Sequence, residues 1–336
     1  MQDSGIWIER RVVAMMRSAW LSGVLIAACA ASDLHAQAFP SKPIRIIVPS
    51  VAGGGTDITA RTIAPKMSEI LGQQVVVENR AGAAMIIGSE AVARAAPDGH
   101  TLLMGISTMT INPFVYKKLP YDTVRDFAPI SQIVSLPNVL VVHPSLPSKT
   151  VKDFVALAKA RPGTLNYASS GNGTIVHLVA EVFAARAHID IVHVPYKAIA
   201  AVVTDLVGGH VPTAFGSLPA AWAQVEAGRL RALAVTTGER SELVPKLPTL
   251  AEAGLDGIDV STWWGLFAPG KTPKDIVARL NAEVQKIVVT DEVKARLTAE
   301  GAQAVTGMTS EAFGALIRNE IAMWRRIAQE RGLKGE

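Results

Sequence analysis

The chain has 336 residues, of which 49% are hydrophobic and 18% charged, a composition typical of a globular protein that is long enough for two domains. Its formal net charge of +4 is spread along the sequence without a block of lysine and arginine. A nucleic-acid-binding function is therefore not indicated, because such proteins gather basic residues on one face or helix. A mild positive balance is compatible with a small anionic ligand.

The first 38 residues have the pattern of an export signal. Three arginines precede an apolar run at 19–31, and Ala36-Gln37-Ala38 offers a small-x-small cleavage site. The apolar run is too short to span a bilayer as a permanent helix. An alternative stays open, because the residues up to Cys29 also fit a lipobox, which would make Cys29 a lipid anchor. We expect a signal peptide over 1–38 and a periplasmic mature protein, which would contain no cysteine.

The first predicted structural unit is a strand, a glycine loop and a helix. Residues 44–48 are mostly β-branched, as in a buried strand, and the proline that follows ends it. Three glycines at 53–55 allow positive φ angles and close approach to a ligand. Thr56 or Asp57 is expected to cap a helix that runs to about residue 71 and ends at a glycine.

This unit directs free backbone N–H groups and the positive end of a helix toward one spot, which suits an anion. The loop does not end in the Gly-Lys-Ser/Thr of a P-loop, and it lacks the G-x-G-x-x-G spacing of a dinucleotide site. We interpret the loop as a backbone site for a small carboxylate. A tight turn that binds nothing is the alternative.

Strands at 74–78 and 101–104, with a helix between them, continue a β-loop-α alternation. This alternation predicts a parallel or mixed sheet covered by helices. Ligands of such sheets collect at the carboxyl ends of the strands. The loops 50–57, 79–85 and 105–108 all lie at such ends, so we expect them to converge.

The same design returns in the second half of the chain. A strand at 138–143 precedes a helix that Ser148 or Thr150 caps, and a strand at 165–168 leads into the loop 169–174, Ser-Ser-Gly-Asn-Gly-Thr. A helix then opens at about residue 175. Two such loops suggest two halves that close on one ligand, each holding one end, although two independent turns remain the alternative. Further strands are expected at 191–195, 211–215 and 230–235, and further helices at 200–207, 273–289, 292–300 and 310–331.

Catalytic and metal-binding motifs are poorly represented. There is no H-E-x-x-H motif and no G-x-S-x-G elbow, and Ser169-Ser170-Gly171 matches only half of such an elbow. We expect no enzyme activity, no metal and no cofactor. An exported hydrolase centred on Ser169 is the alternative from another functional class, although no nucleophile and base with triad geometry can be proposed from the sequence.

Motifs that match one protein family follow in order along the chain after Ala38. On these motifs the chain resembles the periplasmic substrate-binding proteins of tripartite tricarboxylate transport, the Bug (TctC-like) family. The motifs are Phe-Pro-Ser-Lys-Pro-Ile-Arg at 39–45, Gly53-Gly54 with Asp57, 60–61, 77–80, 82–83, Pro-Asp-Gly-His-Thr-Leu-Leu at 97–103, 119–122, 126–127, 162–169, His-Val-Pro-Tyr-Lys at 193–197, 205–206 and 229–235.

The resemblance implies an α/β, two-lobe periplasmic binding protein of type II, a Venus flytrap with a ligand cleft between its lobes. It places lobe 1 at 39–139 plus 262–336 and lobe 2 at 140–261, with hinge motion where the chain crosses near 138–143 and 260–265. It further implies a monomer that passes a small carboxylate to membrane transporter subunits or to a sensor kinase. An orphan receptor without a dedicated transporter is the alternative.

In the family, backbone amides, small side chains and ordered waters hold the carboxylates. Here the loop 50–57 would hold one carboxylate and the loop 169–174 the other. Asp57 is expected to cap its helix rather than touch the anion, and His177 to be a packed or capping histidine or a ligand contact. Asp205 is expected to orient a water, to meet a cationic group or to lie on a solvated helix surface. The expected ligand-binding residues are Ser50, Val51, Gly53, Gly54, Thr56, Asp57, Ala84, Met85, Ser107, Thr108, Ser169, Ser170, Gly171, Gly173, Thr174, His177, Tyr196, Ile199, Asp205 and Ser217.

Two departures from the family pattern add apolar bulk to these loops. Met85 stands where the family usually has glycine, and 198–201 (Ala-Ile-Ala-Ala) replaces a glycine, small residues and a proline. The hypothesis that follows is a mono- or dicarboxylate with an apolar or aromatic body, and not citrate. Neutral drift at these positions is the alternative.

Overall fold

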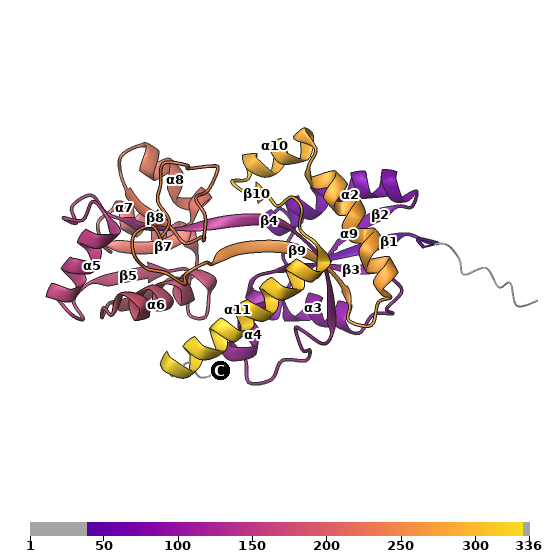
Figure 1. The fold of residues 1–336 in the computed structure, drawn as a ribbon, viewed down its shortest axis with the longest axis horizontal. Helices are drawn as coiled ribbons and strands as arrows, with labels where there is room; N and C mark the ends of the chain where they lie inside the picture. The colour runs from indigo at the N-terminus through magenta and orange to yellow at the C-terminus, as the bar shows by residue number, and fades with distance from the viewer. Residues whose placement is uncertain (1–38, 332–336) are drawn as a thin grey trace, which may run out of the picture. The chain divides into compact units, whose positions relative to one another are not determined.

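The computed structural model describes residues 39–331, so the expected signal peptide and Cys29 lie outside the described residues. From Lys42 onward the chain forms one compact unit. The strands are β1 (Ile44–Val48), β2 (Val75–Asn79), β3 (Thr101–Ile106), β4 (Phe127–Val142), β5 (Asn166–Ser169), β6 (Val192–Pro195), β7 (Thr213–Ser217), β8 (Arg231–Val235), β9 (Ser261–Pro269) and β10 (Gln303–Ala304). They form a sheet in the order β2-β1-β3-β9-β4-β7-β5-β6, and β8 and β10 pair with β4 beside this path (Figure 1).

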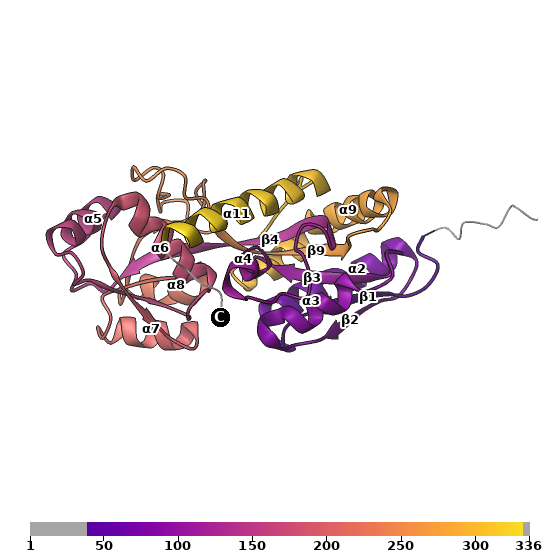
Figure 2. The ribbon, with the colours of Figure 1, turned by 90° about the horizontal axis from the view of Figure 1, so that it is seen from below.

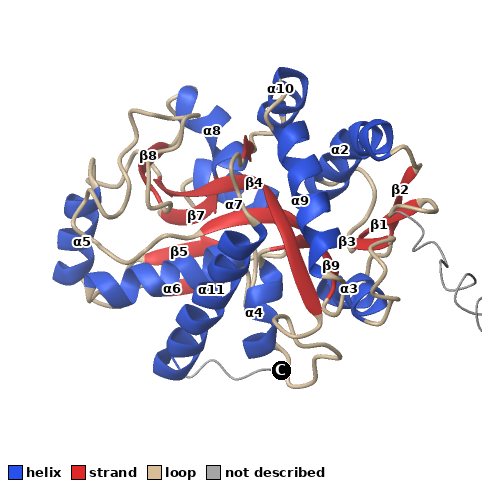
Figure 3. Cartoon of the chain, turned by 45° about the vertical axis from the view of Figure 1, so that its right-hand side comes forward, coloured by secondary structure: helices blue, strands red, loops and turns tan. Residues whose placement is uncertain are grey.

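Helices cover the sheet and alternate with its strands along the chain (Figure 3). The fold is therefore α/β, as expected. The helices are α2 (Gly55–Leu71), a 3-10 turn at Ala83–Met85, α3 (Ile86–Ala93), α4 (Thr108–Val115), α5 (Val151–Ala160), α6 (Ile175–Ala187), α7 (Ile199–Val207), α8 (Leu218–Glu226), α9 (Lys274–Val288), α10 (Asp291–Ala299) and α11 (Ser310–Arg331).

Local sequence explains where several of these elements begin and end. α2 stops at Gly72, whose φ of 67° is the left-handed conformation that glycine adopts without strain. α5 begins with a capping box, in which the Thr150 hydroxyl accepts from the N–H of Asp153 (3.1 Å) and the Asp153 carboxylate accepts from the N–H of Thr150 (3.0 Å). Both ends agree with the sequence-based prediction.

Two long strands join two groups of elements. The first part of β4, residues 127–137, pairs with β9, whereas 138–142 pair with β7 and β8. β9 pairs with β3 on its other side. We call β1–β3, β9 and β10 with α2–α4 and α9–α11 the first lobe, and β5–β8 with α5–α8 the second lobe. The segments expected to cross fall on or next to β4 and β9, while the exact lobe boundaries stay a prediction.

The last helix, α11, packs against the cores of both lobes. Its residues Phe313 and Ile317 belong to a cluster with Leu103 and Phe267 of the first lobe. Trp324 and Ile327 belong to a second cluster, which is built mainly from α5, α6 and the strands of the second lobe. Figure 2 shows α11 running from the side of α9 toward α6.

The prediction missed two helices, α4 and α8, and it missed the first part of β4, the whole of β9 and the short β10. Both helices begin directly after a strand, so no loop composition marks their start: only Ser107 separates β3 from α4, and α8 follows Ser217, the last residue of β7, without a linking residue. α4 also contains Pro113 and α8 begins with a proline in its first turn, and both features hide a helical pattern. Within the described residues, no helix combines the length and apolar character that crossing a membrane requires.

Candidate functional site

The three loops of the first lobe converge, as predicted. β1 lies between β2 and β3, and all three run parallel, so their carboxyl ends lie at one edge of the sheet. The amide of Asn79, at the end of β2, donates to the Ser50 carbonyl (3.1 Å) and to the Asp57 carboxylate (2.9 Å). The hydroxyl of Thr108 donates to the sulfur of Met85 (3.9 Å). This contact joins the loop 105–108 to the loop 79–85.

The expected cap of α2 was wrong. Its N-cap is Gly54, and Thr56 and Asp57 lie in the first turn. The Asp57 carboxylate instead accepts from the N–H of Gly53 (2.9 Å), from Arg61 Nε (3.0 Å) and from Asn79. Asp57 therefore links the glycine loop to Arg61 and Asn79, and the first turn of α2 has no side-chain cap.

The pKa of Asp57 reflects this network. Its side chain is buried, which by itself would raise the pKa. Hydrogen bonds from Arg61, Gly53 and Asn79 outweigh that effect, so the pKa of Asp57 lies below its usual value. The carboxylate is therefore charged at neutral pH, and the N–H of Gly53, expected to serve the ligand, is bonded to it.

Asp57→Asn should lower the free energy of unfolding by about 2 kcal/mol at neutral pH, because hydrogen bonds to a charged group are lost. The depressed pKa means that wild type holds this stability above pH 3.8 and loses it as pH falls through the folded-state pKa. Urea unfolding of both proteins across this range measures the difference. Asp275→Asn, at an exposed position in the first turn of α9, is the matched control and should change stability by under ~0.5 kcal/mol. Equal losses in the two variants would contradict the linking role of Asp57.

The first lobe contains several hydrogen-bond donors that have no acceptor within the described residues and that an anion could use. The first turn of α2 has no side-chain cap, and neither has that of α4, whose N-cap is Ser107. Among the described residues, the hydroxyls of Ser50 and Ser107 and the indole nitrogen of Trp264 are buried and have no hydrogen-bond partner. Ser50 and Ser107 were predicted, whereas Trp264 was missed. Val51, also predicted, is 69% exposed in this loop.

The loop of the second lobe is held by bonds within itself. The Ser169 hydroxyl accepts from the N–H of Gly171 (3.1 Å), and the N–H of Gly173 donates to His177 Nδ1 (3.1 Å). The Thr174 hydroxyl donates to the Gly171 carbonyl (2.8 Å). Gly171 and Gly173 have φ angles of 130° and 71°, which explains the glycines. The free donors that remain are in the first turn of α6, where no side chain caps the helix.

Two stacked histidines lie beneath this loop. The rings of His177 and His193 are 4.0 Å apart, and Tyr167 stacks on His193 at 4.9 Å. Burial lowers the pKa of each histidine to about 4, so both are neutral at physiological pH. The packed or capping role expected for His177 agrees with this environment. The role of His193 was missed, because the strand pairing of β5 with β6 brings it beside Ser169.

His193 Nε2 lies 2.6 Å from the Ser169 hydroxyl, a serine–histidine pair that sequence reasoning did not propose. The side chain of Ser169 is fully buried, and its oxygen also bonds to the backbone of Gly171. The hydroxyl of Tyr167, whose ring covers His193, donates to Glu181 (2.6 Å). The pair is thus part of a packed polar network that shapes the loop.

Four further predicted residues of the second lobe lie near one another in its fold: Tyr196 directly follows β6, Ile199 and Asp205 lie on α7, and Ser217 ends β7. The Tyr196 hydroxyl donates to Asp205 (2.7 Å), and this hydrogen bond raises the pKa of Tyr196 to about 12. A Cβ placed on Gly216 would lie 3.3 Å from the side chain of Ile199, so Ile199 packs on β7. The next residue, Ser217, is the N-cap of α8, which has no side-chain cap.

A direct contact joins helix α4 of the first lobe to the glycine loop of the second lobe. Val115, the last residue of α4, would lie 2.9 Å from a Cβ built on Gly173. Only glycine at 173 lets the second loop approach α4 this closely. The helix α4, whose N-cap is Ser107, therefore starts among the converging loops of the first lobe and ends against the glycine loop of the second.

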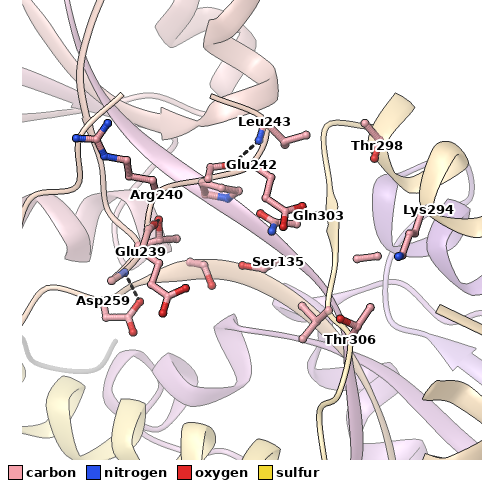
Figure 4. A pocket seen from close by; sticks show the side chains of 17 residues that line it. Ser135, Glu239, Arg240, Glu242, Leu243, Asp259, Lys294, Thr298, Gln303 and Thr306 are labelled. Carbon is pink, nitrogen blue, oxygen red and sulfur yellow. Dashed lines mark hydrogen bonds between the residues drawn. The ribbon is translucent and has the colours of Figure 1, made fainter. Parts of the chain in front are cut away.

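A pocket of ≈ 550 Å³ lies elsewhere and shares no residue with the predicted site (Figure 4). Its walls come from 237–243 of the second lobe and from α10 and β10 of the first. Two of its charged groups have partners, since Asp259 accepts from the N–H of Gly238 (2.8 Å) and Arg240 bonds to Glu252 (2.9 Å). Its lining is Ser135, Pro137, Thr237, Gly238, Glu239, Arg240, Ser241, Glu242, Leu243, Asp259, Ser261, Lys294, Thr298, Gln303, Ala304, Val305 and Thr306.

Comparison with known proteins gives consistent matches. A family model described as the tripartite tricarboxylate transporter family receptor matches residues 59–333. The UPF0065 protein in the tcbD-tcbE intergenic region of Pseudomonas sp. (strain P51) is 41% identical over 314 residues, which cover 92% of this chain and 93% of that protein.

Two solved structures are similar over nearly their whole length. Rpa4515 of R. palustris, solved with adipate, is 35% identical with a TM-score of 0.72, covering 89% of this chain and 100% of its own. MatC (Rpa3494) from Rhodopseudomonas palustris, with bound malate, is 31% identical with a TM-score of 0.67, and the match covers 86% of this chain and 99% of MatC.

Proposed function

This chain belongs to the tripartite tricarboxylate transporter receptor family, and from that premise we propose that it is a periplasmic binding protein that captures a small dicarboxylate between its two lobes. The family and the fold are those of solute-binding proteins. The proposed lobes are 39–139 with 262–336, and 140–261. The captured acid would be delivered to the membrane subunits of a transporter.

One observation carries the proposal. Each lobe has a glycine loop followed by a helix without a side-chain cap, and α4 starts at the 105–108 loop of the first lobe and ends against the glycine loop of the second. Each helix end supplies about half a positive charge and free N–H donors. A ligand with a carboxylate at each end satisfies both sets of donors at once.

Met85 supports a ligand with an apolar body. Its φ is 74°, a left-handed backbone conformation that is uncommon for a residue with a side chain. Residues in such strained conformations cluster at functional sites. The half-buried side chain contacts Thr108 in the converging loops. Adipate, the ligand of one relative, has four methylene groups between its carboxylates, and a thioether side chain would pack against such a chain.

A thermal-shift titration of the mature protein with adipate, malate, citrate and benzoate tests the proposal. A ligand at one hundred times its dissociation constant should add about 2.7 kcal/mol of stability. We expect adipate to stabilise more than citrate, because citrate carries a third charge and no apolar chain. Mass spectrometry of denatured protein checks for an acid retained through purification. Absence of both a shift and a retained acid would refute the proposal.

A further inference from the structure

Two neighbouring tryptophans on β9 differ in the hydrogen bonding of their indole N–H groups. Successive side chains of a strand point to opposite faces of the sheet. The indole N–H of Trp263 donates to Glu320 (2.9 Å) on α11. The indole N–H of Trp264 is buried, and no described residue accepts from it, although only 7% of the Trp264 surface is exposed.

Trp264 lies between the open ends of two helices. Its Cζ2 would lie 3.0 Å from a Cβ built on Gly55, and its Cη2 closer still, so the ring rests on the first turn of α2. On the other side, strand pairing sets Trp264 opposite Ile106, and the next residue, Ser107, is the N-cap of α4. The N–H of Ser107 bonds to the carbonyl of Trp263 (3.0 Å), which fixes this neighbourhood.

The neighbours of Trp264 indicate what kind of group would accept a hydrogen bond from its indole N–H. An indole nitrogen can only donate, and a buried donor without an acceptor costs free energy that an incoming acceptor removes. The hydroxyl of Ser107 is fully buried and lacks a partner in the described part of the chain as well. Since the two helix ends favour negative charge, the acceptor that suits all four groups is an anionic oxygen pair, a carboxylate.

We propose that the indole N–H of Trp264 donates directly to one carboxylate of the bound ligand and so fixes the position of that end of the ligand. The inference rests on the proposed function and adds a specificity residue to it. Because Trp264 lies on β9, one of the two strands that join the lobes, the ligand contacts the hinge itself. The N–H is closed to solvent here, so the ligand enters when the lobes open.

The test compares Trp264→Phe with Trp222→Phe, using adipate in isothermal titration and in intrinsic fluorescence. Trp222 lies on α8, and its N–H already bonds to Glu226 (3.0 Å), so Trp222→Phe should bind adipate as wild type does. Trp264→Phe should raise the dissociation constant at least tenfold. The fluorescence change on binding should persist in Trp222→Phe and be lost in Trp264→Phe.

A second substitution separates the N–H from the shape of the ring. Replacing Trp264 with 3-benzothienylalanine keeps the bicyclic ring and puts sulfur in place of the N–H. It should lose as much affinity as Trp264→Phe. If this isostere binds adipate like wild type, the indole acts only by packing and the inference is overturned.

Binding by wild type and binding by Trp264→Phe test the proposed function and the role of Trp264 separately. If wild type binds no acid of the panel and retains none, the proposed function fails and the inference falls with it. If wild type binds adipate and Trp264→Phe binds it equally well, the binding protein stands and only the role of Trp264 is overturned. If wild type binds another acid of the panel and not adipate, the same comparison is made with that acid.

Discussion

Glu320→Gln should gain stability relative to wild type as pH rises, by about 3 kcal/mol between pH 4.5 and pH 7. Burial raises the pKa of Glu320 from 4.5 to about 7. A raised carboxyl pKa means that the folded protein keeps a proton that the unfolded chain has released. The stability of wild type therefore falls across this interval at about 1.4 kcal/mol per pH unit and stays level above it. Glutamine cannot ionise, so the variant lacks this loss.

The position of Glu320 explains the burial. It lies on α11 between the part that packs on the first lobe and the part that packs on the second. Its carboxyl oxygens contact the N–H of Trp263 (2.9 Å) and the hydroxyl of Thr110 (2.9 Å), which also accepts from the N–H of Trp324 (3.2 Å). The group thus holds α11, α4 and β9 together, and charging it is costly because no cation is bonded to it in these contacts.

Urea unfolding of both proteins at several pH values between 4 and 8 measures the effect. Taking the difference from wild type cancels the contributions of His177 and His193, whose lowered pKa values act in the opposite direction. Glu311→Gln, at an exposed position in the first turn of the same helix, is the control and should track wild type at every pH. Parallel curves for Glu320→Gln and wild type would show that Glu320 is ionised in the folded protein.

Gly55→Ala should destabilise the protein by about 1–3 kcal/mol and weaken adipate binding at least tenfold. A Cβ at this position would collide with the indole ring of Trp264, so either the first turn of α2 or the ring must move. Either movement displaces donors that the proposed ligand needs. Gly55 belongs to the helix itself, so the loss comes from crowding and not from backbone strain.

The neighbouring glycine provides the control. A Cβ on Gly54 would meet only the carbonyl of Val51 at 3.6 Å, and the φ of −79° is open to alanine. Gly54→Ala should therefore cost no more than ~0.5 kcal/mol and leave the indole in place. Thermal unfolding and titration with adipate compare the two variants. Similar behaviour of both alanines would contradict the close contact between Gly55 and Trp264.

Local sequence determined much of the fold. The strand β1, the end of α2 at Gly72, the capping box at Thr150 and the start of α11 follow from side chains within a few residues of each feature. The convergence of three loops also follows, because parallel strands joined by helices bring their carboxyl ends to one edge. The family motifs then identified the class of protein, which the comparisons confirmed.

Only the tertiary structure decided which donors of the site are free. The N–H groups of Gly53 and Gly173 donate to side chains only four positions further along, Asp57 and His177. Strand pairing brings Asn79 onto the Asp57 carboxylate and His193 onto the His177 ring, and these long-range contacts hold the two acceptors in place. Strand order also brings Trp264 of β9 onto Gly55, far away in sequence. A sequence pattern predicts where N–H groups lack helical partners, but the contacts that hold their acceptors, and the buried donor of Trp264, come from strands paired across the chain. The sequence therefore predicted the loops of the site, and long-range packing determined which of their atoms can bind a ligand.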